Sequence, residues 1–235
     1  MTNADTRTPL SRDRILQAAV NLADREGLGA LTMRRLGAEL GVEAMSLYKH
    51  VSSKHDILDG IVELVVSRIE TPDNAAHWRD AMRRRAHSAR EVLARHSWAI
   101  GLLESRRSMG PNQLRYVDAI LGSLRSASFS VDDAAHAFWL IDSYVYGHIV
   151  QEMSMSGTSS PVVAPTPAAE SDAFSTEYPH LAEVAEHALG SPFSFDGEFA
   201  HGLEVILTAL EPAALESDSR PRRAGVPGDT RGPKA

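Results

Sequence analysis

The chain has 235 residues, of which 43% are hydrophobic, contains no cysteine and carries a formal net charge of −7. This length is enough to bury a hydrophobic core in one large domain or two small ones. The absence of cysteine excludes a disulfide scaffold, a Cys-ligated zinc site, an iron–sulfur cluster and a thiol nucleophile. The apolar runs are shorter than the ~18–20 residues of a membrane helix, so we expect a soluble, cytoplasmic protein without a membrane partner. Taken alone, the acidic charge argues against binding to nucleic acid.

The N-terminal part of the chain predicts three helices in a helix-turn-helix arrangement. Hydrophobic residues from Ile15 to Ala23 recur at the spacing of one helix face, which predicts an amphipathic helix. Two short helices follow, separated only by Gly41 and Val42, which suffice for a tight turn. Hydroxyl caps and glycines mark the helix boundaries, at Ser11, Gly27, Thr32 and Gly41. We therefore predict a disordered N-terminus at 1–9 and a helix-turn-helix domain at 10–56.

The rest of the chain also predicts helices and no strand. The helical patterns lie at 54–70, 77–96, 98–105, 111–127, 131–155, 178–189 and 196–210. Residues 157–175 contain three prolines and are expected to form a mobile loop, and residues 212–235 are expected to form a disordered tail. The predicted fold is all-α, with a larger helical domain at 57–211.

Residues 11 to about 65 resemble the tetracycline-repressor (TetR) family of bacterial transcription regulators. The resemblance rests on Leu31 to Gly37, Leu40-Gly41-Val42, Ser46 to Val51 and Lys54 to Leu58. From Trp78 to about Glu211, the chain also resembles the C-terminal domain of the tetracycline repressor proper, through Trp78-Arg79-Asp80, Gly147 with Glu152, and Phe199 to Leu210. The resemblance implies a ligand-responsive homodimer that binds a palindromic double-stranded DNA operator, by default as a repressor. It also implies that the domain at 57–211 binds the ligand and forms the dimer.

The second short helix would enter the major groove with its N-terminal residues on the base edges. Leu47 is expected to face the core, so Ala44 and Met45 could meet thymine methyl groups and Ser46 a phosphate or a base. The resemblance implies that Tyr48 and Lys54 reach phosphates. It also implies that Thr32 and Arg34 contact the DNA backbone and bases. The full set of expected DNA-binding residues is Thr32, Arg34, Arg35, Ala44, Met45, Ser46, Tyr48, Lys49 and Lys54.

Four residues of this segment have a structural alternative. Lys49 could be a solvated or packing residue. Tyr48 could pack the third helix on the first, and Thr32 could serve only as a helix cap. His50 is expected to pack rather than to bind. The residues at Ala44-Met45 differ from the Gln-Pro pair of the tetracycline repressor, so its operator sequence cannot be transferred to this chain.

The resemblance also locates a ligand site. The tetracycline repressor holds a magnesium–drug chelate through histidine, acidic and threonine residues, and an ungapped comparison places these positions near Leu103, Arg106 and Gln151. Leucine cannot bind magnesium, so we expect no metal, no cofactor and an amphipathic effector other than Mg-tetracycline. The expected ligand-binding residues are Glu70, Arg85, Trp98, Leu103, Arg106, Trp139, Ser143, Tyr144 and Gln151. Tyr146, Met153 and Met155 could add aromatic and polarisable surface.

The helices at 131–155 and 196–210 each carry a long apolar stripe that must be buried. In the family, the corresponding helices of two subunits form a four-helix bundle. The expected dimer-interface residues are Phe138, Ile141, Val145, Ile149, Phe199, Leu203, Ile206, Leu207 and Leu210. The alternative is that both stripes face only the core of one chain.

No catalytic motif occurs in the sequence, so we expect no catalytic residue and no enzymatic activity. His148 with Glu152, or the trio His77, His87 and His96, could hold a metal, but such groupings arise by chance among 10 histidines. The basic run at 83–85 is expected to be solvated or paired with acids. An activator, or an interaction module that kept the helix-turn-helix shape, remains an alternative to a repressor.

The acidic charge is unevenly distributed. Residues 1–56 carry 8 Lys+Arg against 7 Asp+Glu, whereas residues 57–235 carry 16 against 24. DNA contact should therefore be confined to a small positive face. The cations of that face are Arg34, Arg35, Lys49 and Lys54. A single helical pattern from Lys54 to Glu70 suggests that a bound effector tilts this helix and changes the separation of two recognition helices.

Overall fold

The structure, a computed structural model, describes residues 9–73, 76–105, 108–155, 172–190 and 194–216. Within these ranges the secondary structure is helical and contains no strand, which confirms the all-α prediction. The helices are α1 (Arg12–Glu26), the short 3-10 helix η1 (Leu28–Ala30), α2 (Met33–Leu40), α3 (Ala44–Leu47), α4 (Lys54–Val66), α5 (Trp78–Arg95), α6 (Trp98–Ser105), α7 (Pro111–Ser126), α8 (Val131–Ser154), α9 (Asp172–Glu177), α10 (Pro179–Gly190) and α11 (Phe195–Glu216). None of these helices is long and apolar enough to cross a membrane.

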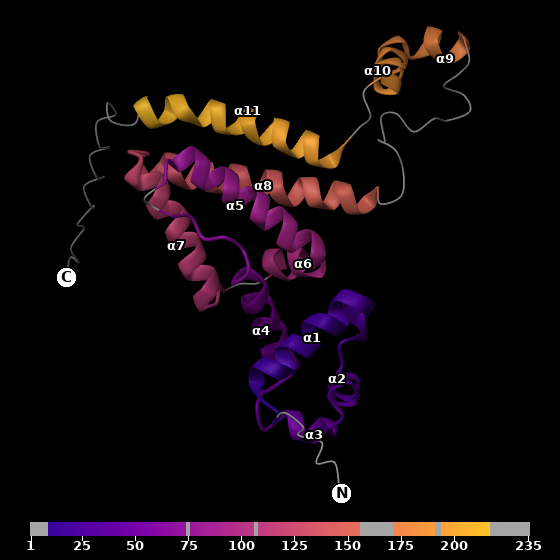
Figure 1. Cartoon of the computed structure of the whole chain (residues 1–235), viewed down its shortest axis with the longest axis vertical. Helices are drawn as coiled ribbons and strands as arrows, with labels where there is room; N and C mark the ends of the chain where they lie inside the picture. The colour runs from indigo at the N-terminus through magenta and orange to yellow at the C-terminus, as the bar shows by residue number, and fades with distance from the viewer. Residues whose placement is uncertain (1–8, 74–75, 106–107, 156–171, 191–193, 217–235) are drawn as a thin grey trace, which may run out of the picture.

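The helices form a small head and a larger body. The head contains α1, α2 and α3 at one end of the molecule, and α4 leads from it into the body (Figure 1). In the body, α5, α7 and α11 all pack against α8. The helices α9 and α10 pack against each other and stand away from the body in Figure 1.

The head owes its helix boundaries to local signals in the sequence. Ser11 Oγ accepts a hydrogen bond from the Arg14 N–H at 3.2 Å, and Thr32 Oγ1 accepts one from the Arg35 N–H at 3.2 Å, so both residues act as the predicted caps. Gly41 ends α2 in the left-handed conformation, with a φ of 69°, that glycine adopts without a steric penalty. The head therefore forms where the sequence predicts it.

A close approach between α2 and α3 makes the turn of the head tight. A Cβ atom at Gly37 would lie 2.8 Å from the carbonyl oxygen of Val42 and 3.1 Å from the backbone nitrogen of Ala44. Any larger residue would have to push the backbone of the turn away, and with it the start of α3. Gly37 thus fixes the distance between the two short helices.

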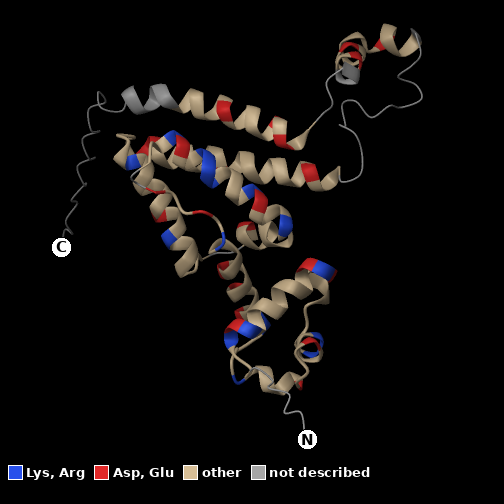
Figure 2. Cartoon of the chain, in the orientation of Figure 1, with Lys and Arg blue, Asp and Glu red and all other residues tan. Residues whose placement is uncertain are grey.

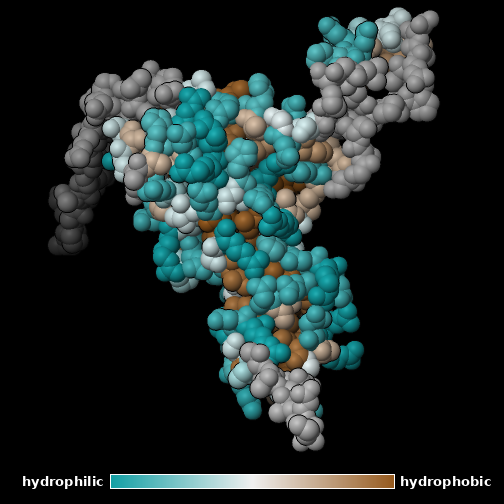
Figure 3. Space-filling view, viewed as in Figure 1, coloured by the Kyte–Doolittle hydropathy of each residue, from teal (hydrophilic) through white to brown (hydrophobic). Residues whose placement is uncertain are grey.

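Two hydrophobic cores meet within α4. Ile57 and Ile61 belong to the core of the head, whereas Val62, Val65 and Val66 belong to the core of the body, and all five are buried. In the space-filling view, hydrophobic side chains are visible where the head meets the body, with polar side chains over most of the remaining visible surface (Figure 3). Because α4 takes part in both cores, a movement of the body can reach the head through this helix.

The predicted end of this helix was wrong. The pattern predicted a helix to Glu70, but α4 ends at Val66. The Ser67 hydroxyl donates a hydrogen bond to the Leu64 carbonyl at 2.7 Å. The N–H groups of Arg68 and Ile69 then bond to carbonyls three residues back rather than four, which tightens the chain into a turn.

Two predicted irregular segments overlap helices. Of the expected mobile loop at 157–175, residues up to 171 lie outside the described part of the chain, but residues 172–175 belong to α9. The expected tail from residue 212 begins as helix, because α11 continues to Glu216. Strong helix formers follow Pro212, at Ala213-Ala214-Leu215. Residues 1–8 and 217–235 also lie outside the described part.

The predicted dimer interface must be corrected. Six of its residues are covered by this chain itself and have no surface left for a partner, because α8 and α11 turn these side chains toward each other and toward α5. They are Ile141, Val145, Ile149, Phe199, Leu203 and Leu207. The alternative interpretation, that the apolar stripes serve the core of one chain, holds for these six. Ile206 and Leu210 are half-buried, and half-buried Phe138 lines a cavity described below.

Candidate DNA-binding face and effector cavity

The short helix α3 presents side chains outward from a buried anchor. Leu47 is fully buried in the head, whereas 73% of Met45 and 47% of Tyr48 is exposed. Ala44 and Ser46 are half-buried beside them. Because Tyr48 is turned outward, it is available to a ligand of the size of DNA. His50, which was expected to pack, is exposed.

The turn between α3 and α4 is held against α1. Arg12 donates two hydrogen bonds to the Asp56 carboxylate, at 2.6 and 3.0 Å, and the Ser52 N–H donates a third at 2.8 Å. The hydrogen bond from Arg12, followed by that from Ser52, holds the pKa of Asp56 well below its usual value. Lys54 is exposed at the start of α4, directly after the cap residue Ser53. An exposed cation at a helix N-terminus is placed to meet a phosphate, together with the adjacent backbone N–H groups.

The positive charge of the head is smaller than the sequence predicted. Arg35 donates both of its shortest hydrogen bonds to the Glu26 carboxylate, at 2.7 and 2.8 Å. Arg34, Lys49 and Lys54 are exposed and form no ion pair with another described residue. Figure 2 shows acidic and basic residues mixed along α1 and α2. The cations that are free to meet phosphate are thus few, and they lie on α2, after α3 and at the start of α4.

The body contains a cavity of about 510 Å³. Its walls come from the end of α4, from α5, α6, α7 and α8, and from the turn before α7. Three of the predicted ligand-binding residues line it, namely Arg85, Leu103 and Trp139. Tyr146, named as possible aromatic surface, also lines it. Pockets of this size bind drug-sized molecules, so the cavity is the candidate effector site.

A buried polar network crosses one side of this cavity. Arg85 is 1% exposed, and its Nε donates to the Tyr116 hydroxyl at 2.8 Å while its Nη2 donates to the Asp142 carboxylate. Burial alone would lower the pKa of Arg85, but the charges and hydrogen bonds of Tyr116 and Asp142 outweigh it and raise the pKa above its usual value. Burial, followed by the charge of Asp142, also raises the pKa of the Tyr146 hydroxyl. Arg85 is thus a permanent cation and Tyr146 a neutral phenol.

Other predicted ligand-binding residues lie elsewhere. Glu70 is exposed and accepts a hydrogen bond from Arg84 at 3.0 Å. The Tyr144 hydroxyl donates to the Phe199 carbonyl at 3.0 Å, and its ring stacks on that residue between α8 and α11. Ser143, Gln151 and Trp98 do not line the cavity either. Arg106 lies outside the described residues.

The sequence interpretation missed five polar residues of the cavity wall, Glu104, Ser108, Gln113, Tyr116 and Asp142. Asp142 is the most informative of these, because it is a lone acid in the apolar stretch from Ala137 to Val145. A carboxylate in such a stretch must be paired when it is buried. That signal was present in the sequence, but its partner Arg85 lies 57 positions away in the chain.

The cavity is connected to α4 through Glu63. The Glu63 carboxylate accepts hydrogen bonds from the backbone N–H groups of Asn112 at 2.6 Å and Gln113 at 3.3 Å, in the first turn of α7. The Asn112 side chain donates back to the Glu63 carbonyl at 3.1 Å. The next residue, Gln113, lines the cavity. The first turn of α7 therefore touches the effector site on one side and the helix that enters the head on the other.

A second polar cluster joins α1 to the body. Trp98 Nε1 donates to the Asp24 carboxylate at 2.7 Å, and His96 Nδ1 lies 2.8 Å from the same oxygen. Arg68 contacts His96 Nε2 at 2.8 Å and also donates to Gln17 of α1 at 2.8 Å. Because arginine only donates, Nε2 of His96 accepts and Nδ1 donates to Asp24. Trp98 therefore serves the contact between head and body.

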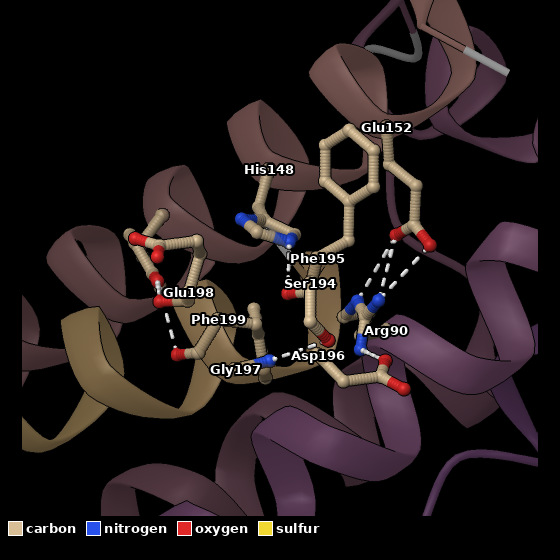
Figure 4. Close-up of polar contacts among 10 residues, drawn as sticks. Arg90, His148, Glu152, Ser194, Phe195, Asp196, Gly197, Glu198 and Phe199 are labelled. Carbon is tan, nitrogen blue, oxygen red and sulfur yellow. Dashed lines mark hydrogen bonds and ion pairs between the residues drawn. The ribbon is translucent and has the colours of Figure 1, made fainter. Parts of the chain in front are cut away.

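A third cluster fastens the start of α11 (Figure 4). Arg90 of α5 donates to Glu152 of α8 at 2.9 Å and to Asp196 of α11 at 2.6 Å. His148 Nε2 donates to the Phe195 carbonyl at 3.1 Å, and burial, followed by the charge of Arg90, lowers the pKa of His148. His148 and Glu152, which could have shared a metal, thus have other partners. The described residues contain no group of three or more potential metal ligands.

Models of two known families match most of the chain. Residues 15–61 match bacterial regulatory proteins of the tetR family, and residues 71–213 match the tetracyclin repressor-like C-terminal domain. The chain is 32% identical to the HTH-type transcriptional repressor DrrR1 of Streptomyces coeruleorubidus, over 86% of this chain and 77% of that protein. It is 26% identical to the class D tetracycline repressor protein of Escherichia coli, over 86% and 89% of the two chains.

Solved structures share the fold over nearly the same length. Apo ActR from Streptomyces coelicolor matches with a TM-score of 0.71 and 27% identity, over 89% of this chain and 99% of that one. The structure of ActR in complex with actinorhodin matches with a TM-score of 0.69 and 27% identity, over 88% and 99%. The matches agree with the helix-turn-helix head and the cavity-bearing body described above.

Proposed function

This chain belongs to the tetR family of bacterial regulatory proteins, and from that premise we propose that it is a repressor that an amphipathic small molecule releases from a palindromic operator. The observation that carries the proposal is the position of α4. One end of this helix holds an exposed cation beside α3, and the other end lines the cavity. ActR is seen in complex with actinorhodin, which supports an organic molecule as the effector here.

On the DNA, α3 would lie in the major groove. Met45 and Ala44 would contact base edges, and Ser46, Tyr48 and Lys54 would contact phosphates or bases. The set of Thr32, Arg34, Arg35 and Lys49 would complete the contact surface. Arg35 can contact a phosphate only by giving up its ion pair with Glu26. It should therefore contribute less to DNA affinity than the unpaired Lys54.

A second copy of this chain would supply the second helix-turn-helix head, for the second half-site of the operator. The outer faces of α8 and α11 offer exposed hydrophobic side chains, at Leu140 (46% exposed), Val150 (51%) and Val205 (57%). Exposed Ser143 and Gly147 lie between the first two on α8 and permit a close approach of another helix. We propose this surface, rather than the buried stripes, as the dimer interface. Val205→Asp should then give a monomer in sedimentation experiments and should lose operator binding.

The effector would act on DNA binding through Glu63. Molecules that fill the cavity must adjust α7, and the bonds from Asn112 and Gln113 to Glu63 pass that adjustment to α4. DNA affinity falls only if the effector binds the adjusted state better than the DNA-bound state. Glu63→Gln removes the charge that holds both N–H groups. It should reduce the effect of an effector on DNA affinity more than it reduces DNA affinity itself.

The proposal is tested by selecting DNA from a random duplex library with the full chain. We expect two-fold symmetric sites with half-sites about 34–36 Å apart, bound below about 1 μM with a steep loss of affinity as salt rises. A thermal-shift screen then supplies effectors, and these should release the selected duplex. If no symmetric duplex is enriched, the chain is an interaction module instead. If effectors tighten binding, the chain is an activator or a co-repressed regulator.

A further inference from the structure

One buried nitrogen in the wall of the cavity has no partner. Arg85 Nη1 forms no hydrogen bond with any residue that the structure describes, although Arg85 is only 1% exposed. The other two nitrogens of the guanidinium have partners, with Nε on Tyr116 and Nη2 on Asp142. Buried donors without an acceptor are rare in folded proteins, and they are costlier still when the donor is charged.

The guanidinium cannot satisfy this nitrogen by turning. Its central carbon lies 5.3 Å from the centre of the Tyr116 ring and 5.9 Å from that of Phe138, so aromatic rings lie against the group. Rotation would also break the hydrogen bonds to Tyr116 and Asp142, which come from two other helices, α7 and α8. No described residue supplies an acceptor for Nη1, and Arg85 lines the cavity, so a molecule bound there is placed to supply one.

The charges around the cavity select the kind of acceptor. Among the described residues that line it, Arg85 is the only cation, whereas Asp142 and Glu104 are both acids. Asp142 already neutralises Arg85. A carboxylate ligand would add a further negative charge to a wall that is already balanced or acidic. A neutral oxygen would satisfy Nη1 without that penalty.

We propose that the effector is a neutral, mostly apolar molecule whose carbonyl oxygen accepts a hydrogen bond from Arg85 Nη1. The proposal rests on the proposed function of the cavity and deepens it by naming the chemical class of the effector. Leu103, Phe138 and Trp139 form an apolar surface for the body of such a molecule. The acidic pair partner Asp142 discriminates against anions, and Arg85 discriminates against hydrocarbons that lack an acceptor.

Three probes that share the fluorene ring skeleton separate the effects of a neutral acceptor, of no acceptor and of a negative charge. Fluorenone carries a neutral carbonyl, fluorene carries no acceptor, and fluorene-9-carboxylate carries an anion. Calorimetric titration of the full chain should show fluorenone binding at least tenfold more tightly than fluorene, which corresponds to about 1.4 kcal/mol. The carboxylate should bind no more tightly than fluorene. Equal affinities for fluorenone and fluorene, tightest binding of the carboxylate, or no binding of fluorenone would each overturn the proposal.

Two variants assign the preference to Arg85. Arg85→Lys keeps the charge beside Asp142 but removes the planar fork, so the preference for fluorenone should disappear. Arg84→Lys changes the exposed neighbour on the same helix and should keep it. Retention of the preference in folded Arg85→Lys would contradict the proposal. If that variant does not fold, Asp142→Asn provides a second test. It leaves the charge of Arg85 without a compensating carboxylate, so the affinity for fluorene-9-carboxylate should rise at least tenfold. An unchanged affinity would count against the proposal.

Operator binding, measured on the same preparations without probe, separates this inference from the proposed function. If the chain binds its selected duplex but shows no preference for fluorenone, the inference fails and the function as a DNA-binding regulator stands. If the preference is present but no duplex is bound, the cavity chemistry stands and the regulatory function fails.

Discussion

The head and the body of this molecule carry their candidate sites in different ways. The candidate DNA-binding face of the head is made of exposed side chains that follow one another closely in the chain, such as Met45, Tyr48 and Lys54. The cavity of the body is made of buried side chains that are far apart in the chain. Arg85 meets Tyr116 across 31 positions and Asp142 across 57.

This difference determines how each site responds to substitution. In the head, exposed contact residues are separate from the residues that hold the fold, so function can be lost without loss of stability. In the body, Arg85 and Asp142 are part of the core and of the cavity wall at once. A substitution there should change stability and ligand binding together.

The largest effect is expected in the body, at Asp142. Asp142→Ala leaves the buried cation of Arg85 without its carboxylate, which should lower the free energy of unfolding by about 3–5 kcal/mol. Glu91→Ala is the control, because it removes an ion pair with Arg95 in which both side chains are more than half exposed. Such a pair contributes about 0–1 kcal/mol. Urea unfolding measures the free energy of unfolding of the two variants. Similar losses in Asp142→Ala and Glu91→Ala would contradict the expectation that the buried ion pair matters more than the exposed one.

A smaller loss of stability is expected in the head, at Leu47. Leu47→Ala creates a cavity under α3 and should lower the free energy of unfolding by about 2–5 kcal/mol. Met45 lies two residues away and is mostly exposed, so Met45→Ala should change the free energy of unfolding by no more than about 0.5 kcal/mol. Met45→Ala should still weaken DNA binding and change the preferred bases. If it left operator preference unchanged, Met45 would not lie against base edges.

Lys54 should affect DNA binding without affecting stability. Lys54→Ala removes an exposed cation at the start of α4 and should weaken binding to all duplexes by roughly tenfold. It should also reduce the slope of log affinity against log salt by about one unit. Arg95→Ala, an exposed cation on α5 of the body, should leave both values unchanged. Fluorescence anisotropy at several salt concentrations measures both quantities.

The smallest effect is expected from acid titration of the head. The pKa of Asp56 is lower in the folded chain than in the unfolded chain, mainly because of the hydrogen bond from Arg12. The stabilisation from this group is therefore complete above about pH 5 and is lost as the pH falls toward the folded pKa. Asp56→Asn should flatten the decline of unfolding free energy between about pH 5 and pH 3. Asp118→Asn, at an exposed aspartate of α7, should keep the decline.

The sequence alone predicted most of the helices and nearly all of the head. Ser11, Thr32 and Gly41 act locally, through side-chain caps and a left-handed turn, so their effects could be read without a fold. The early end of α4 was not predicted from the sequence, where the hydrophobic pattern continues past Val66 and does not show that the Ser67 hydroxyl bonds to the Leu64 carbonyl. The apolar stripes of α8 and α11 were found correctly, but their partner was not.

Periodicity determines that a helix has an apolar face, and composition shows that this face must be covered. Neither says which surface covers it, and here α8 and α11 cover each other, so Ile141 and Phe199 lie inside one chain. The sequence by itself therefore determined the class of fold and the outward position of Met45 and Tyr48 around buried Leu47, because both depend on neighbours along the chain. Only the tertiary structure decided the cavity, because Arg85, Tyr116 and Asp142 come from three helices and form a site only when these pack together.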